Sequence, residues 1–209
     1  MIASPSVEID SLQRLHFKPR QSIPQYSDCL WHIEKGLVRT FTWDEEGDLA
    51  ILGLWGPGDC VGQPLANMTP FQIESLCEVD VQAVPVSSSE LGRMMRSQIR
   101  HMEKLFSINS YKRAPQRLLY FLDWLGSRFG QQIEQGRLLD VGLTHQLIAE
   151  MMGLNRITTT RLLNELAREN KIKLFPKQRI LLTCNMTDSS NRLNPLLLGP
   201  CETNSKDVA

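Results

Sequence analysis

The 209-residue sequence has no apolar run near the roughly 18 residues that a membrane-spanning helix requires, so we expect no membrane association. Its start lacks a basic segment followed by an apolar stretch, which argues against a secretory signal peptide. The chain also lacks net charge, because 23 Lys and Arg residues balance 23 Asp and Glu residues. With 42% hydrophobic and 22% charged residues, the composition is that of a globular protein of one or two domains and excludes a wholly disordered chain.

Patterns of metal ligands are missing as well. The cysteines are odd in number, widely spaced and without a C-x-x-C pair, so no disulfide framework, zinc ribbon or iron–sulfur site is indicated. They are Cys29, Cys60, Cys77, Cys184 and Cys201. We expect small buried side chains in a reducing cytoplasm. No H-E-x-x-H pair occurs either. A β-barrel enzyme or ligand-binding barrel, which would need a metal triad or an acid–base pair, is therefore a remote alternative.

The zero net charge hides an uneven distribution. Residues 1–112 contain 10 basic and 14 acidic residues, a net of −4, whereas residues 113–209 contain 13 and 9, a net of +4. Residues 153–183 hold seven basic and two acidic residues, a net of +5. Such asymmetry indicates an acidic domain joined to a nucleic-acid-binding domain, although a solvated basic face without a partner is the simpler alternative.

The N-terminal half is predicted to be all β. Short apolar runs occur at residues 31–33, 37–43, 49–55 and 79–84, and glycine-rich turns such as Gly56-Pro-Gly-Asp59 separate them. Residues 79–84 largely alternate apolar and polar, as on a half-buried strand. Several short strands at this spacing favour a sandwich or barrel.

A long helix is expected after residue 86. The serines at 87–89 offer N-caps, Glu90 suits the first turn, and no proline occurs before Pro115. Residues that step by four and three along this helix form a seam typical of a coiled coil, opposite a charged face. The seam consists of Met95, Ile99, Met102, Phe106 and Asn109. It predicts a homodimer in which Asn109 fixes the register, and a helix packed on its own sheet is the alternative.

A hinge is predicted at residues 109–115. Pro115 disfavours helix at the residue before it and suits a first helical turn, so one helix should end near Ser110 and another should begin near Pro115. The second helix carries apolar residues with helical spacing, and Gly130 suits its C′ position. These apolar residues are Leu118, Leu122, Leu125 and Phe129.

Residues 144–166 have the spacing of a helix-turn-helix. Thr144 can cap a helix whose small Ala149 allows a close crossing, and Gly153 follows four residues later, where the turn requires a positive φ. The second helix should bury three leucines and present a polar face, which is what reading of the major groove requires. From this region we predict contacts with double-stranded DNA by Thr144, His145, Arg156, Ile157, Thr158, Thr160, Arg161 and Asn164.

The segment after this helix predicts a wing, a β-hairpin that contacts the phosphate backbone. Residues 171–183 contain two strand-like runs around Pro176. The basic residues expected to meet phosphates are Lys171, Lys173, Lys177 and Arg179. An αα-hairpin with a basic exterior is the alternative, but it does not account for the coincidence of turn, wing and charge.

The order of these elements resembles the cyclic-AMP-receptor/fumarate-nitrate-reduction (Crp/Fnr) family of bacterial transcription regulators. The resemblance covers about residues 20–184 and rests on Gly36-Leu-Val-Arg39, on the glycine-rich run at 54–62, on Arg117-Leu-Leu-x-Phe-Leu122, and on residues 143–149 with 161–163. It implies an α+β fold with an N-terminal β-roll (a cupin-like jelly roll), a long dimerisation helix and a C-terminal winged helix-turn-helix. It also implies a homodimer that is not an enzyme, binds palindromic promoter DNA as an activator and contacts RNA polymerase.

The resemblance leaves the effector open. Cyclic-nucleotide binders of the family use an Arg for the phosphate, but no basic residue lies between Arg39 and Arg93, so cyclic AMP is not expected. The cysteines of the oxygen-sensing branch and a convincing haem histidine are absent, so we expect no cofactor. The recognition helix is similar to that of cyanobacterial nitrogen-control regulators, with Ile157 where the cyclic-AMP receptor has a Glu. That branch senses 2-oxoglutarate, for which Arg100 and Glu103 are weak candidates here, and a ligand-independent activator is the third possibility.

The predicted organisation has four parts. A β-roll sensor spans residues 1–86, the dimerisation helix and hinge span 87–112, and the winged helix-turn-helix spans 113–184. Residues 185–209 are rich in Ser, Asn and Thr and are expected to form a flexible tail.

Overall fold

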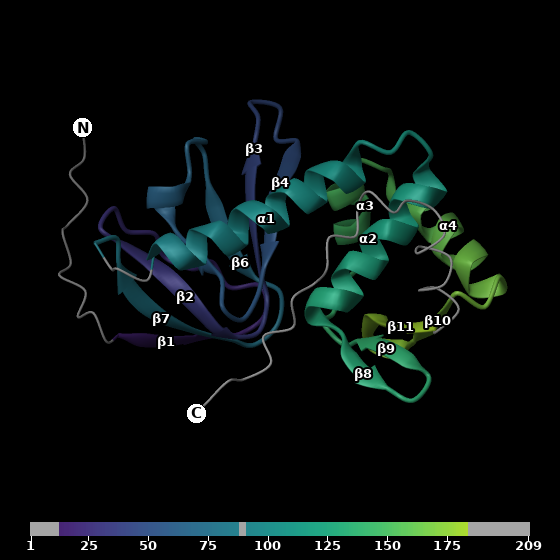
Figure 1. The fold of residues 1–209 in the computed structure, drawn as a ribbon. Coiled ribbons are helices and arrows are strands. Elements are labelled where there is room, and N and C mark those ends of the chain that lie inside the picture. The colour runs from purple at the N-terminus through teal and green to yellow at the C-terminus, as the bar shows by residue number, and fades with distance from the viewer. Residues whose placement is uncertain (1–12, 88–90, 184–209) are drawn as a thin grey trace.

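The computed structural model describes residues 13–87 and 91–183. The predicted caps at residues 88–90 and the predicted tail at 185–209 lie outside this part of the chain. Within it, a β domain is followed by a long helix and then by a smaller domain of helices and one sheet (Figure 1). This is the α+β arrangement that the sequence predicts. None of the helices in the described residues is long and apolar enough to span a membrane.

The N-terminal domain consists of two antiparallel sheets. The first has the order β1 (Arg14–Phe17), β7 (Val79–Pro85), β2 (Cys29–Lys35) and β5 (Cys60–Val61). The second has the order β4 (Leu49–Trp55), β3 (Val38–Trp43) and β6 (Gln72–Ser75), and the short helix η1 (Gln63–Leu65) follows β5. Buried side chains from both sheets, among them Trp31, Ile33 and Ile73, form a common core. The N-terminal domain is thus the predicted β-roll.

All four predicted strands are confirmed as β2, β3, β4 and β7. Strands β1, β5 and β6 were not predicted from the sequence, because they are short and carry few apolar residues in a row. Strand β1 joins the sheet only by pairing with β7, where Leu15 lies opposite Val81. Pairing partners so distant in sequence leave no local pattern.

Helix α1 (Leu91–Asn109) leads from the β-roll to the second domain (Figure 1). It is held to the β-roll by the Gln98 side chain, which is buried and donates to the backbone carbonyl of Cys60. Helix α2 (Ala114–Phe129) follows, so the predicted break in the helix near Pro115 is confirmed. The connection is braced by contact between the rings of Tyr111 and Tyr120, whose centroids lie 4.7 Å apart and whose planes are tilted by 31°.

The C-terminal domain packs α2 against a helix pair and a four-stranded sheet. Its further elements are β8 (Gln131–Ile133), β9 (Gly136–Leu139), α3 (His145–Met152), α4 (Arg156–Arg168), β10 (Ile172–Phe175), η2 (Pro176–Gln178) and β11 (Arg179–Thr183). The sheet order is β10-β11-β9-β8. All four apolar residues predicted for α2 contribute to the core, and Leu118, Leu122 and Leu125 are fully buried. The hairpin of β8 and β9 was not predicted. Gly130 ends α2 as an extended C-cap, with φ −81° and ψ 142°, rather than as a left-handed residue.

Candidate nucleic-acid interface

Helix α3 and the turn after it have the predicted geometry. The hydroxyl of Thr144 accepts a hydrogen bond from the backbone N–H of Leu147 at 2.9 Å and so caps the helix. Gly153 adopts the left-handed conformation, with φ 57° and ψ 42°, and Ala149 is buried where the helices cross. The chain therefore turns sharply from α3 into α4.

Helix α4 is amphipathic in the sense that DNA reading requires. The side chain of Asn155 accepts from the backbone N–H of Thr158 at 2.7 Å and fixes the start of the helix. The inner face buries Leu162, Leu163 and Leu166, as predicted, and also Thr159. Because the core holds this face, the opposite face of α4 is turned to solvent.

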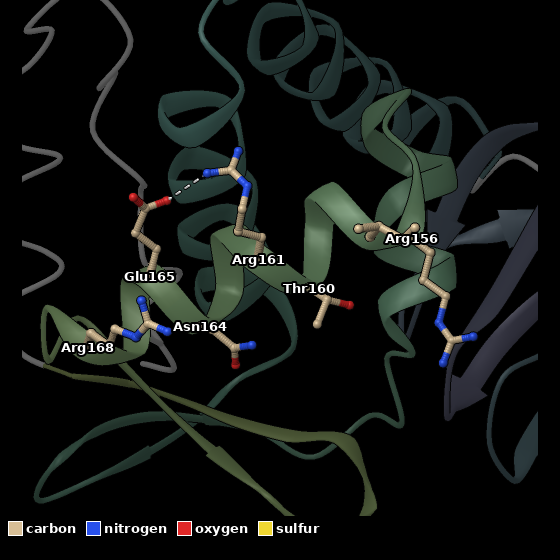
Figure 2. A pocket seen from close by; sticks show the side chains of 7 residues that line it. Arg156, Thr160, Arg161, Asn164, Glu165 and Arg168 are labelled. Atoms are coloured by element: carbon tan, nitrogen blue, oxygen red, sulfur yellow. Dashed lines mark ion pairs between the residues drawn. The ribbon is translucent and has the colours of Figure 1, made fainter.

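The outer face of α4 forms a shallow concave surface (Figure 2). Its lining residues are Arg156, Ile157, Thr160, Arg161, Asn164, Glu165 and Arg168. Arg161 lies 3.6 Å from the Glu165 carboxylate, but both side chains are more than half exposed, so this ion pair is weak and can be exchanged for a ligand. Five of the predicted DNA-contacting residues, Ile157 among them, thus share one surface.

Three other predicted DNA contacts are engaged within the domain. Thr144 caps α3, and Thr158 is half-buried beside the Asn155 cap. The Nδ1 atom of His145 lies 2.9 Å from the hydroxyl of Thr160 and links α3 to α4. Burial, followed by the positive charge of Arg156, lowers the pKa of His145, so the neutral imidazole is favoured at this link.

The wing is formed by β10 and β11, which pair antiparallel with Phe175 opposite Arg179. Lys173 and Lys177 are exposed, and Lys177 stands in the turn with φ 60°. Lys171 instead lies 2.6 Å from Glu169 in an ion pair, and the Arg179 guanidinium lies over the Phe175 ring at 5.9 Å. Lys173 and Lys177 are therefore the wing residues best placed for phosphate.

The predicted seam of α1 is largely exposed. Phe106 is 79% exposed and Ile99 and Met102 are each 53% exposed, which is unfavourable for apolar side chains in an isolated chain. Asn109 differs from the expectation, because its amide donates to the carbonyl of Met151 in α3 at 3.5 Å. It therefore contacts the helix-turn-helix of its own chain.

A cavity of about 290 Å³ lies between α1 and the β-roll. Its walls are mostly apolar, and none of the described side chains that line it is charged. Its polar side chains include those of Thr40, Asn67 and Gln98. The indole N–H of Trp55, which also lines the cavity, donates a hydrogen bond to the Thr40 hydroxyl at 2.9 Å. The two predicted effector residues, Arg100 and Glu103, are exposed on α1 and do not line the cavity.

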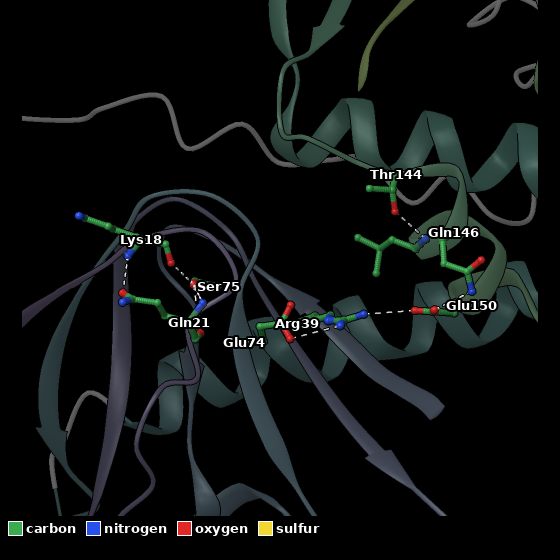
Figure 3. Close-up of polar contacts among 9 residues, drawn as sticks. Lys18, Gln21, Arg39, Glu74, Ser75, Thr144, Gln146 and Glu150 are labelled. Carbon is green, nitrogen blue, oxygen red and sulfur yellow. Dashed lines mark hydrogen bonds and ion pairs between the residues drawn. The ribbon is translucent and has the colours of Figure 1, made fainter. Parts of the chain in front are cut away.

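Ionic contacts that no sequence motif predicts join the two domains. Arg39 of β3 lies between Glu74 of β6, at 3.3 Å, and Glu150 of α3, at 3.2 Å (Figure 3). Glu150 also accepts from the side chain of Gln146 at 2.8 Å. The first helix of the helix-turn-helix is thus tied to the β-roll.

A second contact lies at the end of α2. Arg128 forms an ion pair with Asp59, whose side chain is 4% exposed and also accepts from the backbone N–H of Gly56 at 2.8 Å. His101 of α1 lies 3.7 Å from the same carboxylate. Burial lowers the pKa of Arg128, although the charge of Asp59 opposes the shift. In both pairs, Arg39 with Glu150 and Asp59 with Arg128, the partners are about 70 or more residues apart in the sequence. Because a sequence motif covers only a short stretch of chain, no motif revealed these pairs.

A β-roll joined through a long helix to a winged helix-turn-helix, with a basic recognition face, defines a DNA-binding transcription regulator. Comparisons with known proteins agree. Residues 116–186 match the family description of a Crp-like helix-turn-helix domain. The Regulatory protein CysR of Synechococcus elongatus is 43% identical over 162 residues, which cover 76% of this chain and 79% of that protein.

This chain belongs to the Crp/Fnr family of transcription regulators, which are not enzymes. The Global nitrogen regulator of Synechococcus elongatus is 34% identical over 116 residues, 54% of this chain and 52% of that protein. A CRP/FNR-family regulator from Thermus thermophilus has the same fold, with a TM-score of 0.68 and 22% identity over 86% of this chain and 98% of its own.

Proposed function

We propose that this protein binds palindromic promoter DNA as a homodimer, with α4 in the major groove and the wing on the phosphate backbone. The observation that carries the proposal is the exposed polar face of α4, whose other face is fixed in the core. Arg156 and Arg161 suit guanine, which accepts two hydrogen bonds at O6 and N7, and Asn164 suits adenine.

The exposed seam on α1 supports the homodimer. Pairing two copies through Met95, Ile99, Met102 and Phe106 would cover the apolar side chains that one chain leaves in water. Two recognition helices related by a two-fold axis read half-sites about 34 Å apart, one turn of DNA. Replacing Phe106 by Glu should shift the protein from dimer to monomer in light scattering, whereas an unchanged mass would contradict this seam.

The cavity between α1 and the β-roll supports an uncharged effector. A cyclic nucleotide or 2-oxoglutarate would bring negative charge to walls whose described side chains include no cation, and burying an unpaired charge is costly. Thr40 and Cys60 of the wall are sequence neighbours of Arg39 and Asp59, which hold the second domain. An occupant could therefore shift the orientation of the helix-turn-helix about the 109–115 junction.

The further properties that we propose rest on the family. They are activation through contact with RNA polymerase, action in the cytoplasm, and function without an iron–sulfur or haem group. Tight, sequence-specific DNA binding by protein stripped of small molecules would favour a ligand-independent activator over a sensor.

The test is binding to duplexes selected from a randomised library, measured by mobility shift. Replacing Arg156 or Arg161 by Ala should cost about 1–3 kcal/mol on the selected duplex and relax base preference. Replacing Lys177 by Ala should weaken binding to all sequences and reduce the salt slope by about one. Equal losses on selected and random DNA for the Arg161 variant would refute direct readout by α4.

A further inference from the structure

The large apolar side chain of Ile157 is exposed to solvent on the recognition helix, and neither its own fold nor the dimer seam covers it. It is 82% exposed, more than any other large hydrophobic residue in residues 13–87 and 91–183. It stands apart from the other strongly exposed apolar side chains, which lie on α1, and it contributes to neither hydrophobic core. Its neighbours on the concave face of α4 are polar or basic.

The position of Ile157 is fixed although its side chain is not packed. It lies in the first turn of α4, which the Asn155 side chain caps at 2.7 Å. This turn contains no acidic residue, although carboxylates are favoured there, so its N–H groups and Arg156 leave a positive end. A positive helix end attracts the acceptor-rich surface of DNA and brings Ile157 toward the bases.

The chemistry of the major groove then restricts what Ile157 can contact. An aliphatic side chain neither donates nor accepts hydrogen bonds, and the one apolar group that base edges present in this groove is the C5-methyl of thymine. Over a cytosine amino group or a guanine carbonyl, Ile157 would displace water without replacing its hydrogen bond, which is unfavourable. The base pair beneath Ile157 is therefore selected by apolar contact.

We propose that Ile157 is a specificity-determining residue that selects a thymine in each half-site by contact with its C5-methyl group. This proposal rests on the proposed DNA-binding function and assigns one base of the operator to one side chain. Arg156 and Arg161 supply the neighbouring hydrogen-bonded readout, so the thymine should lie within the same half-site as the guanines that they contact.

The test replaces thymine by deoxyuridine, which removes the methyl and leaves every hydrogen-bonding group of the base in place. The best duplex from the randomised library is prepared with each symmetric pair of thymines replaced in turn, and affinities are measured by fluorescence anisotropy. One pair should matter. Its replacement should weaken the wild-type protein about fourfold per half-site, or about 15-fold for the dimer, as expected for one buried methyl contact.

Variants connect that base to Ile157. Ile157→Ala should bind thymine and deoxyuridine duplexes equally, and Ile157→Val should retain most of the difference. Ile157→Glu should change the preference at that position from thymine to cytosine, because a carboxylate accepts from the cytosine amino group. Lys177→Ala is the matched control, since it should lower affinity for all duplexes and leave the deoxyuridine effect intact. Circular dichroism checks that the Ile157 variants are folded.

The outcomes distinguish a failure of the proposed DNA-reading function from a failure of the proposed role of Ile157. If the selection enriches no sequence, the proposed DNA-reading function is overturned, and this proposal with it. If a sequence is enriched but no thymine is sensitive to deoxyuridine, or if Ile157→Ala keeps the wild-type sensitivity, only the role of Ile157 is overturned.

Discussion

We predict that the ion pairs of Arg39 with Glu74 and Glu150 stabilise the contact between the two domains, and this can be tested by mutation. The guanidinium of Arg39 forms ion pairs with the Glu74 carboxylate of its own domain, at 3.3 Å, and with the Glu150 carboxylate of α3, at 3.2 Å. Replacing Arg39 by Ala leaves both carboxylates close together without the cation, and it also removes the contact of the guanidinium with the Phe41 ring at 4.8 Å.

The expected cost follows from the partial burial of the three side chains. Removing one partner of a fully buried ion pair costs about 3–5 kcal/mol, whereas an exposed pair contributes about 0–1 kcal/mol. Arg39, Glu74 and Glu150 have side chains that are 16%, 23% and 17% exposed, between these limits. We therefore expect Arg39→Ala to lower the free energy of unfolding by about 2 kcal/mol.

The assay is urea denaturation of a double-mutant cycle. Arg39→Ala, Glu150→Ala and the double variant should give a coupling energy of about 1 kcal/mol, which falls as salt is added. Arg14 and Glu34 provide the matched control, because they lie 2.9 Å apart but Arg14 is 69% exposed. Their cycle should give less than about 0.5 kcal/mol.

A coupling between Arg39 and Glu150 no larger than that of the Arg14 pair would refute this reasoning. It would mean that the contact contributes no cohesion between the β-roll and the helix-turn-helix, whatever its distance. The route proposed from the effector cavity to α3 through Arg39 would then lose its support.

Three further predictions concern buried or half-buried polar groups. Arg128→Ala should lower the free energy of unfolding in urea by about 3 kcal/mol, because it leaves the 4%-exposed Asp59 carboxylate without its guanidinium. Arg128→Lys, which keeps a cation, should lower it less, and equal losses for the two variants would argue against the ion pair. The lowered pKa of His145, caused by burial and then by Arg156, means that the unfolded chain binds more protons. The free energy of unfolding should thus fall as the pH drops through the ordinary His value of about 6.5, and His145→Gln should flatten this part of the profile. Burial and then Asp59 raise the pKa of Cys60 to about 12, so peptide mapping should find this thiol unmodified by iodoacetamide at pH 8 until urea is added, and alkylation in native protein would contradict its burial.

The sequence predicted those features that are written in local patterns. Thr144 and Gly153 specify a cap and a turn within a few residues, and the structure has both where the sequence predicts them. The leucines of α4 and the break before Pro115 are likewise local, because helical periodicity and proline sterics act over one or two turns.

Other features depended on contacts that no local pattern records. Thr144 and His145 have the polarity of DNA-contacting residues, but their neighbours in space are Leu147 and Thr160, to which they are hydrogen-bonded. Asn109 fits the heptad seam, yet its amide contacts α3. Arg100 and Glu103 directly follow Ile99 and Met102 of the cavity lining on α1, but their own side chains are exposed and do not line the cavity.

By itself, the sequence determined the order of the elements, the inner and outer faces of α4 and the separation of an acidic half from a basic half. These properties arise from residue type and spacing along the chain. The tertiary structure decided which polar residues are available for DNA, the uncharged cavity beside α1, and the ion pairs of Arg39 and Arg128 that join the domains. Each of these depends on groups far apart in sequence, whose meeting is fixed by how the β-roll and the helices pack.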